Sequence, residues 1–258
     1  MQNHVSKVEQ QFGSVAEAYL SSPVHSRGAD LEAVIEKLKQ KPLGRVLDLG
    51  CGAGHLSFAT APFAESVVAY DLSPEMIGIV DREARQRKLG NLSVQRGQVE
   101  KLPFEASTFD WVVTRYSAHH WNDVPRALRE VHRVLRSDGS LIIIDVYAPE
   151  DPLLDTHLQT LELLRDGSHV RNYSLSNWNS MLLEAGFRID NHSTWKLPLD
   201  FKAWIERMKT SDVFVDAIQT LMHKAPHEVQ HYFQIAEDNS FVIDSALVEA
   251  RQTTISSD

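Results

Sequence analysis

The sequence predicts an α/β protein built on a doubly wound, mostly parallel sheet. Apolar stretches alternate with amphipathic ones up to residue 146, which is the pattern of a parallel sheet covered by helices on both faces. The segment 45–54 reads as a buried strand that breaks into a glycine turn and opens a helix. A second apolar strand, 67–70, ends in Asp71. These observations place a ligand site where the first two strands end.

Residues 1–41 predict helices that precede the sheet. Apolar residues recur there at three- and four-residue spacing, in two stretches separated by Ser22-Pro23. They are Phe12, Val15, Ala16 and Tyr19 in the first stretch and Leu31, Val34, Ile35 and Leu38 in the second. We expect these helices to form a cap over the open edge of the ligand cleft.

The middle of the chain, 42–198, supplies most of the predicted core. Its elements include a fourth strand at 111–115, a helix at 124–135, a turn at 137–139 and a continuously apolar fifth strand at 141–146. Helices are expected at 153–164 and 178–185, the second closed by Gly186 before a sixth strand begins at Phe187.

Residues 199–236 predict a largely helical insertion, which we expect to act as a lid and to select the substrate. The last segment, 237–258, returns to the core and contains the apolar run 241–248. With 258 residues the chain is long enough to bury one core and carry such a lid, so we expect a single domain.

The glycine turn predicts which kind of ligand binds. Gly50, Gly52 and Gly54 lack a Cβ atom, so the turn can take positive φ and a ligand can lie against its N–H groups. Asp71 at a strand tip can accept hydrogen bonds from both ribose hydroxyls of a nucleoside. Asp48 would repel a pyrophosphate, but it suits a ligand that carries an ammonium and a sulfonium group. The turn therefore favours S-adenosylmethionine over a dinucleotide, whose sites usually show G-x-G-x-x-G rather than G-x-G-x-G.

At these residues the sequence resembles the class I S-adenosylmethionine-dependent methyltransferases of the methyltransferase type 11 group. The resemblance rests on the run 46–54, on Asp71 and on the stretch 96–110, and it covers residues 40–150. It implies a Rossmann-like seven-stranded sheet whose last strand is antiparallel, with the helical insertion between strands six and seven. It also implies S-adenosylmethionine as the cofactor and S-adenosylhomocysteine as its product.

The family pattern further implies which residues contact the cofactor. Gln98 stands where the family often has Asp, and we expect it to reach the purine edge through its amide or through neighbouring backbone N–H groups. Tyr19 is similar to a lid tyrosine of related methyltransferases, or it packs as a core residue of its apolar stripe. The cofactor-binding candidates are Asp48, Gly50, Cys51, Gly52, Gly54, His55, Asp71, Leu72, Met76, Gln98, Val99, Arg115 and Tyr19.

A narrower likeness extends over nearly the whole chain. The segments 115–121, 147–152 and 165–171 resemble a small group of uncharacterised bacterial methyltransferases within the ubiquinone/menaquinone methyltransferase-like superfamily. This likeness supports the fold and the cofactor, and it leaves the methyl acceptor and its atom open.

Two adjacent histidines are the candidates for catalysis. Methyl transfer needs mainly that the acceptor and the methyl group be held close and collinear, but a base helps when the acceptor starts protonated. His119 and His120 lie at the tip of the predicted fourth strand, and imidazoles can accept protons near neutrality. We prefer His120, with the alternative that one histidine packs beside Trp121 while the other is exposed. The histidines lack metal-ligand spacing, so no metal is expected.

Composition bounds the partners and the compartment. The formal net charge of −9, from 26 Lys and Arg against 35 Asp and Glu, disfavours a nucleic-acid substrate. No apolar run approaches the roughly 20 residues of a membrane helix. Cys51 is the single cysteine and the first residues are polar, so we expect neither an internal disulfide nor a signal peptide, and a cytoplasmic location. Oligomeric state stays open.

Three functions fit these observations. The favoured one is methyl transfer from S-adenosylmethionine to an O, N or C nucleophile of a small molecule. A nicotinamide-dependent oxidoreductase is the first alternative, and a non-catalytic S-adenosylmethionine-binding protein is the second.

Overall fold

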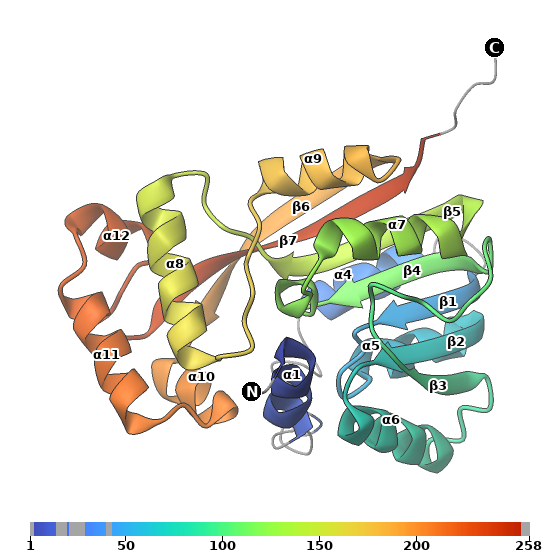
Figure 1. Ribbon diagram of the computed structural model, residues 1–258, viewed down its shortest axis with the longest axis horizontal. Coiled ribbons are helices and arrows are strands. Elements are labelled where there is room, and N and C mark those ends of the chain that lie inside the picture. The colour runs from blue at the N-terminus through green and yellow to red at the C-terminus, as the bar shows by residue number, and fades with distance from the viewer. Residues whose placement is uncertain (1–2, 14–19, 21–28, 40–42, 254–258) are drawn as a thin grey trace.

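The computed structural model of the protein describes residues 3–13, 20, 29–39 and 43–253. Its core is one seven-stranded sheet (Figure 1). The strands are β1 (Leu43–Leu49), β2 (Ala64–Asp71), β3 (Leu92–Arg96), β4 (Phe109–Arg115), β5 (Leu135–Val146), β6 (Phe187–Leu199) and β7 (Phe241–Gln252). Their order is β3-β2-β1-β4-β5-β7-β6, and β7 runs antiparallel to both of its neighbours. The predicted doubly wound sheet with an antiparallel last strand is confirmed.

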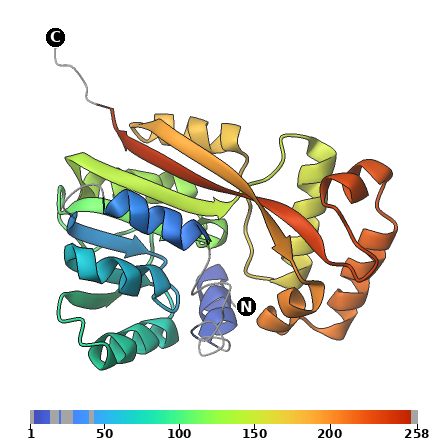
Figure 2. The ribbon, with the colours of Figure 1, turned by 180° about the vertical axis from the view of Figure 1, so that it is seen from behind.

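Helices cover both faces of the sheet, as Figures 1 and 2 show from opposite sides. They are α1 (His4–Gly13), α4 (Ala29–Leu38), α5 (His55–Thr60), η1 (Ala61–Phe63), α6 (Pro74–Gln86), η2 (Ala118–His120), α7 (Val124–Val134), α8 (Pro152–Arg165), α9 (Leu175–Glu184), α10 (Phe201–Met208), α11 (Asp212–His223) and α12 (His227–Tyr232). Helices α7 and α9 lie on one face, and α4, α5 and α6 on the other. Within the described ranges, no helix has both the length and the apolar character needed to cross a bilayer.

Side-chain caps fix where the core helices begin. Ser73 caps α6 by accepting a hydrogen bond from the N–H of Met76. Asp123 caps α7 in the same way, and a proline occupies the first turn of both helices, where its missing N–H costs nothing. The starts of α6 and α7 are therefore specified by local residues.

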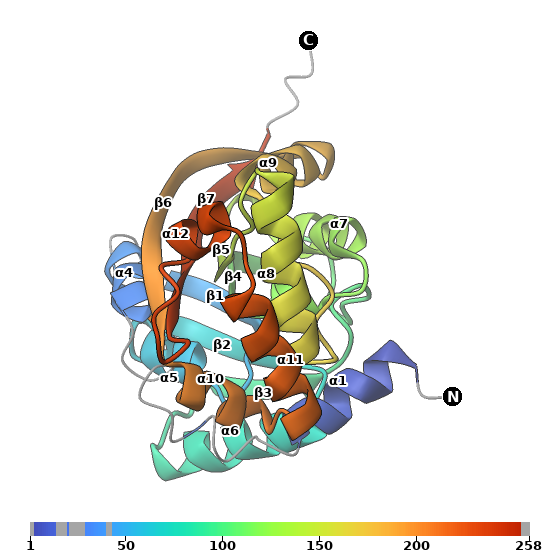
Figure 3. The same ribbon diagram turned by 90° about the vertical axis from the view of Figure 1, so that its left-hand side faces the viewer.

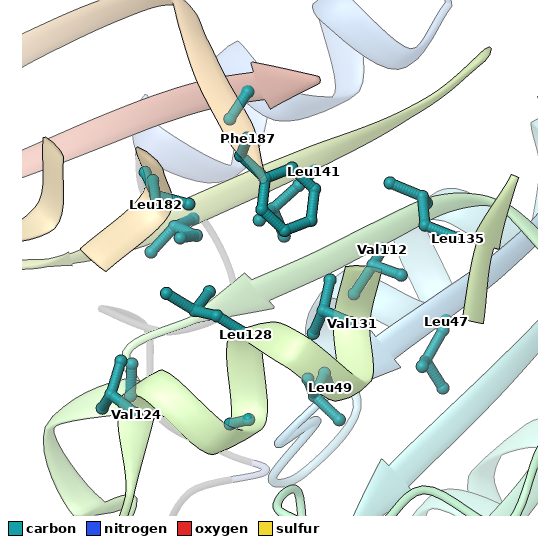
Figure 4. Packing of buried hydrophobic residues seen from close by; sticks show 14 of the residues in the cluster. Leu47, Leu49, Val112, Val124, Leu128, Val131, Leu135, Leu141, Leu182 and Phe187 are labelled. Carbon is teal, nitrogen blue, oxygen red and sulfur yellow. The ribbon is translucent and has the colours of Figure 1, made fainter. Parts of the chain in front are cut away.

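The larger core cluster lies between the sheet and α7. Leu47, Leu49 and Val112 point from the strands toward Leu128 and Val131 of the helix, and all five are buried (Figure 4). Because β1 and β4 are covered on both faces, their side chains are apolar on both sides. This packing holds the carboxyl ends of β1 and β4 at one rigid edge.

The predicted helical insertion is present as helices α10, α11 and α12 between β6 and β7, and we call it the lid after its expected role. These helices lie beside the end of β6 and the start of β7, and α8 packs among them (Figure 3). Their shared core includes Trp204, Ile218, Met222, Phe233 and Phe241. The sequence analysis assigned α8 to the core region, so its membership in the lid cluster is a finding of the structure.

The two described N-terminal helices lie in different places. Helix α4 packs Leu31, Val34 and Leu38 on the sheet, and it contributes no residue of the described part of the chain to the ligand cavity. Helix α1 instead lies between the sheet and the lid (Figure 1). There, the side chain of Gln11 donates a hydrogen bond to the carbonyl of Met208 at 3.0 Å. Of the two described helices, α1 therefore lines the cleft and α4 does not, which corrects the expectation for α4.

The turn expected at 137–139 falls inside β5 as the structure defines it. Leu135 pairs with Phe109 and Ser140 pairs with Trp111, so the register shifts and the intervening residues form an irregularity of the strand. The predicted apolar run from Leu141 onward is buried, as expected for an inner strand.

Replacing Leu128 by Ala tests the packing between α7 and the sheet. Leu128 is 1% exposed, so Leu128→Ala should lower the free energy of unfolding by about 2–5 kcal/mol because it leaves a cavity. Leu163→Ala on α8, where the side chain is 55% exposed, is the matched control and should change it far less. Urea denaturation measures both. Equal losses in the two variants would contradict this view of the core.

Candidate functional site

A cavity of about 800 Å³ opens at the carboxyl ends of β1, β2 and β4. Its floor comes from the ends of these strands and from the turns that follow them. One wall comes from α1, and the opposite wall comes from α8, the residues after it, β6 and α10. The cavity therefore lies where open α/β sheets bind ligands, between the core and the lid.

The glycine turn after β1 presents backbone to this cavity. Gly50 and Gly52 have φ angles of +72° and +51°. Residues with a Cβ atom rarely adopt such positive angles. The N–H groups of Gly50 and Cys51 donate to the carbonyl of Tyr70 at 2.8 and 3.0 Å, which joins the turn to β2. A Cβ atom on Gly52 would meet nothing within 4 Å, so this side of the turn faces open space where a ligand can approach.

Asp71 stands beside the turn at the end of β2. Its two carboxylate oxygens accept hydrogen bonds from the N–H of Gly52 at 2.8 Å and of Ser73 at 2.9 Å. Burial raises the pKa of Asp71, while these backbone donors oppose the rise. Each oxygen keeps a further lone pair, so the carboxylate can accept two more donors from a molecule in the cavity.

Asp48 lies beneath the turn and is 1% exposed. Burial raises its pKa to about 7, although the Ser57 hydroxyl donates to its Oδ2 at 2.5 Å and favours the ionised form. The guanidinium of Arg115 on the neighbouring strand also favours the ionised form. This carboxyl is thus poised between its two protonation states at the floor of the cavity.

Most of the predicted cofactor-binding residues line the same cavity. They are Asp48, Gly50, Cys51, Gly52, His55, Asp71, Leu72, Met76, Gln98, Val99 and Arg115. The carbonyl of Gln98 accepts a hydrogen bond from the Tyr70 hydroxyl at 3.1 Å, which fixes the loop after β3. Burial raises the pKa of the Cys51 thiol, which therefore stays protonated and is a poor nucleophile.

One predicted residue is placed elsewhere, and another is not described. Gly54 is not among the described residues that line the cavity; it has φ +84° and begins α5, where a Cβ atom would lie 2.8 Å from a methyl group of Val80. Its missing side chain therefore permits close packing of α5 on α6. Tyr19 lies outside the described residues.

His119 and His120 both line the cavity, just beyond β4. Tyr116 has φ +51°, and the chain turns there into the short helix η2 that carries both imidazoles. Nδ1 of His119 lies 2.6 Å from Oδ1 of Asp145 at the end of β5. Nδ1 of His120 lies 3.1 Å from the carbonyl of Ser168, so the hydrogen of this ring is on Nδ1.

The pKa values of the two neighbouring imidazoles are shifted in opposite directions. Burial alone would lower the pKa of His119, but Asp145, with Glu162 and Asp166, raises it above its ordinary value. Burial, followed by the charge on His119, lowers the pKa of His120 to about 3. Of the pair, His119 therefore takes the proton.

A third imidazole, His169, follows α8 and adds to this wall. Its Nε2 lies 3.0 Å from the side-chain oxygen of Gln159, and its ring centre is 5.7 Å from that of His119. Burial, then the charges on His119 and His120, lowers its pKa to about 2. Among the described residues, no three His, Cys, Asp or Glu side chains are arranged to hold a metal ion.

The sequence analysis missed the residues that surround the histidines. Asp145 carried a signal, because an acidic residue interrupts an otherwise apolar strand, Leu141–Val146. Glu162, Asp166 and His169 carried none, since their position depends on how α8 packs against the core. The cavity walls contributed by α1 and by β6 also depend on tertiary packing.

Comparisons with known proteins show which proteins this chain resembles. The family described as "Methyltransferase domain" matches residues 47–143. The uncharacterized protein YafE of Escherichia coli K12 is 45% identical over 203 residues, covering 79% of this chain and 98% of that protein. The uncharacterized methyltransferase YcgJ of Bacillus subtilis is 36% identical over 93% of this chain and 97% of its own length.

Solved structures show the same relationship. The crystal structure of a putative methyltransferase from Bacillus halodurans C-125 is 31% identical, with a TM-score of 0.84 over 88% of this chain and 100% of that one. The crystal structure of YcgJ is 34% identical, with a TM-score of 0.83 over 88% of this chain and 99% of that chain.

The lowered pKa of His169 predicts part of the acid sensitivity of the fold. This imidazole stays neutral in the fold, while in the unfolded chain it takes a proton below about pH 6.5, so its contribution to stability is lost as the pH falls. His169→Gln keeps a donor to Gln159 and removes the titration. The loss of unfolding free energy between pH 7 and pH 5.5 should therefore be smaller by roughly 1 kcal/mol in this variant.

Urea denaturation at the two pH values measures the effect. His192→Gln, at an exposed position of β6, is the control and should keep the pH dependence of the unmodified protein. If His169→Gln also keeps it, the neutral state of His169 in the fold is wrong.

Proposed function

Because this chain belongs to the class I S-adenosylmethionine-dependent methyltransferases, we propose that it binds S-adenosylmethionine and transfers the methyl group to an O, N or C nucleophile of a small molecule. S-adenosylhomocysteine is the other product. The acceptor enters from the side of the lid, and α1 closes the cavity behind it.

One observation carries the proposal. The backbone of Gly52 borders open space in the cavity, and its N–H donates to the carboxylate of Asp71. That carboxylate keeps lone pairs that can accept further hydrogen bonds. This combination suits a nucleoside whose ribose hydroxyls donate to the acid while its other parts lie against bare peptide. The buried acid Asp48 under the same turn disfavours a pyrophosphate there.

The proposed cofactor contacts divide among the three strand ends. Gly50, Cys51 and Gly52 offer backbone, and Asp71 takes the ribose. Leu72 and Met76 form an apolar wall for the adenine, and Gln98 with Val99 lies at its polar edge. Asp48, His55 and Arg115 face the amino-acid part, where a carboxylate and a guanidinium suit an ammonium and a carboxylate.

The chemistry asked of the chain is mainly positioning. The bound sulfonium supplies an activated methyl group, so the protein must hold the acceptor in line and keep water out. Helix α1 and the lid contribute the dry walls of the cavity. His119 and His120 stand on the acceptor side and are the proposed groups that accept a proton.

Calorimetric titration separates the proposal from both alternatives. S-adenosylmethionine should bind the unmodified protein, and NADH should not. Gly52→Val should abolish binding, because the new side chain occupies the space that the cofactor needs. Gly78→Val, on the exposed surface of α6 where a Cβ atom also meets nothing within 4 Å, should bind normally.

Turnover then decides between an enzyme and a binding protein. The protein should transfer labelled methyl groups from the cofactor to small molecules of a metabolite extract, as mass spectrometry detects. Binding of NADH in place of S-adenosylmethionine would favour the oxidoreductase. Cofactor binding without any labelled product would favour the non-catalytic alternative.

Asp71→Ala tests the proposed ribose contact. The variant should bind S-adenosylmethionine more weakly by about 1.5–3 kcal/mol, since hydrogen bonds to a charged acceptor are lost. Asp81→Ala removes a surface carboxylate of α6, where Asp81 pairs with Arg85, and should leave affinity unchanged. Unchanged affinity in a folded Asp71→Ala variant would remove Asp71 from this role.

A further inference from the structure

His119 is held in one orientation by contacts on three of its groups. Its ring Nδ1 lies 2.6 Å from Asp145, and its backbone N–H donates to the other oxygen of the same carboxylate at 3.3 Å. Its carbonyl accepts from the N–H of Val170 at 2.8 Å. A carboxylate can only accept, so the hydrogen of the neutral ring is on Nδ1 and the lone pair is on Nε2.

That lone pair is the reactive feature of the site. Within the described residues, Nε2 of His119 has no hydrogen-bond partner, and the ring lines the cavity. His120 differs, because its Nδ1 donates to Ser168 and its ring is covered by an edge contact with Phe12 at 4.8 Å. The geometry therefore favours His119 as the base, where the sequence analysis preferred His120.

The carboxylates near His119 are already engaged. Asp145 binds His119 itself, Glu162 accepts from Arg165 at 2.7 Å, and Asp166 accepts from the hydroxyl of Ser168 at 2.6 Å. A substrate ammonium would therefore compete with partners that each acid already has. The site beside His119 is thus better suited to a neutral acceptor than to a charged amine.

One wall of the cavity carries apolar and aromatic side chains among charged ones such as Lys196 and Arg207. It includes Trp195 and Leu197 of β6, Trp204 of α10 and Ile243 of β7. Trp204 is fixed by an edge contact with Phe241 at 5.0 Å and by the guanidinium of Arg165, 4.9 Å from its ring centre. The indole of Trp195, which is partly exposed, suits an acceptor with a ring or another apolar body.

We propose that the methyl acceptor is a phenol or an enol with an apolar body, and that His119, positioned by Asp145, removes the proton of its hydroxyl group. This inference rests on the proposed function, since it takes the methyl group from bound S-adenosylmethionine. His119 is the catalytic base, and Asp145 is a positioning residue.

The proposed step balances in atoms and charge. The O–H bond of the acceptor breaks, and its proton goes to Nε2 of His119. The oxygen electron pair forms the new O–CH₃ bond, and the pair of the broken S–CH₃ bond stays on sulfur, which becomes the neutral thioether. The imidazolium, stabilised by Asp145, then releases the proton to water.

The imidazole suits this proton transfer. Burial lowers the pKa of His119, but the carboxylates of Asp145, Glu162 and Asp166 raise it above its ordinary value, while His120 and His169 remain neutral beside it. A phenol or an enol is a weak acid that such a base can help to ionise, whereas a thiol already ionises in part without help.

The first test needs no acceptor. The imidazole signals of His119, followed by NMR against pH in the unmodified protein, should titrate at a higher pH than in Asp145→Asn, because the amide removes the charge that holds the proton. The exposed His192 provides a second imidazole signal for comparison in both proteins. An unchanged titration of His119 in Asp145→Asn would overturn the role of Asp145.

The second test uses 4-nitrophenol, whose phenolate is yellow. With S-adenosylhomocysteine bound, the unmodified protein should bind the probe as phenolate at a pH where the free probe is mostly neutral. His119→Asn keeps a donor toward Asp145 but lacks the lone pair of Nε2, so it should bind the neutral phenol. Neutral phenol bound by the unmodified protein would overturn the inference.

Turnover completes the test, with benzylamine and thiophenol as amine and thiol probes. With S-adenosylmethionine, the phenol should be methylated, and kcat should fall about 100-fold or more in His119→Asn and shift in its pH profile in Asp145→Asn. His192→Asn is the control. A larger loss in His120→Asn than in His119→Asn, methylation of the amine or thiol alone, or methylation of none of the three would overturn the inference.

Calorimetry with S-adenosylmethionine distinguishes a failure of this inference from a failure of the proposed function. If calorimetry shows that S-adenosylmethionine binds but the phenol fails as above, only the acceptor class and the base are wrong. If S-adenosylmethionine does not bind, the proposed function itself is wrong.

Discussion

The hydrogen bond between Asp71 and the N–H of Gly52 organises the whole ligand site. It joins the end of β2 to the turn after β1, and the same carboxylate also binds the N–H of Ser73, which caps α6. The acid therefore fixes the positive-φ turn and the start of the next helix together. Because these contacts leave one lone pair on each oxygen and Asp71 lines the cavity, the group that shapes the turn is also the proposed ribose acceptor.

The cavity combines a rigid half at the strand ends with a half built from elements that lie far apart in the chain. The ends of β1, β2 and β4 are held by cores on both faces of the sheet, so the proposed cofactor contacts lie on fixed backbone. The acceptor side is built from α1, α8, β6 and α10, which meet only through tertiary packing. This division explains how one core can serve many methyl acceptors, since the lid can change without disturbing the cofactor site.

The sequence predicted the features that local residues determine. Continuous apolar runs such as Leu141–Ile144 indicate inner parallel strands, and the glycines of the turn indicate positive φ, which Gly50 and Gly52 have. From the sequence we preferred His120 to His119. The contacts that separate them could not be predicted, because they come from Asp145 and Ser168, which lie far along the chain. The place of α4 on the sheet could not be predicted either, because an apolar stripe shows that a helix packs but not against what.

The most direct test of the account is a crystal structure of the protein with S-adenosylhomocysteine. The account predicts the ribose hydroxyls of the ligand within hydrogen-bond distance of Asp71, its backbone-facing side against Gly50–Gly52, and its sulfur directed toward the side of the cavity that holds His119. A ligand bound elsewhere, or side chains of α1 filling this crevice while the ligand is excluded, would contradict the central claim.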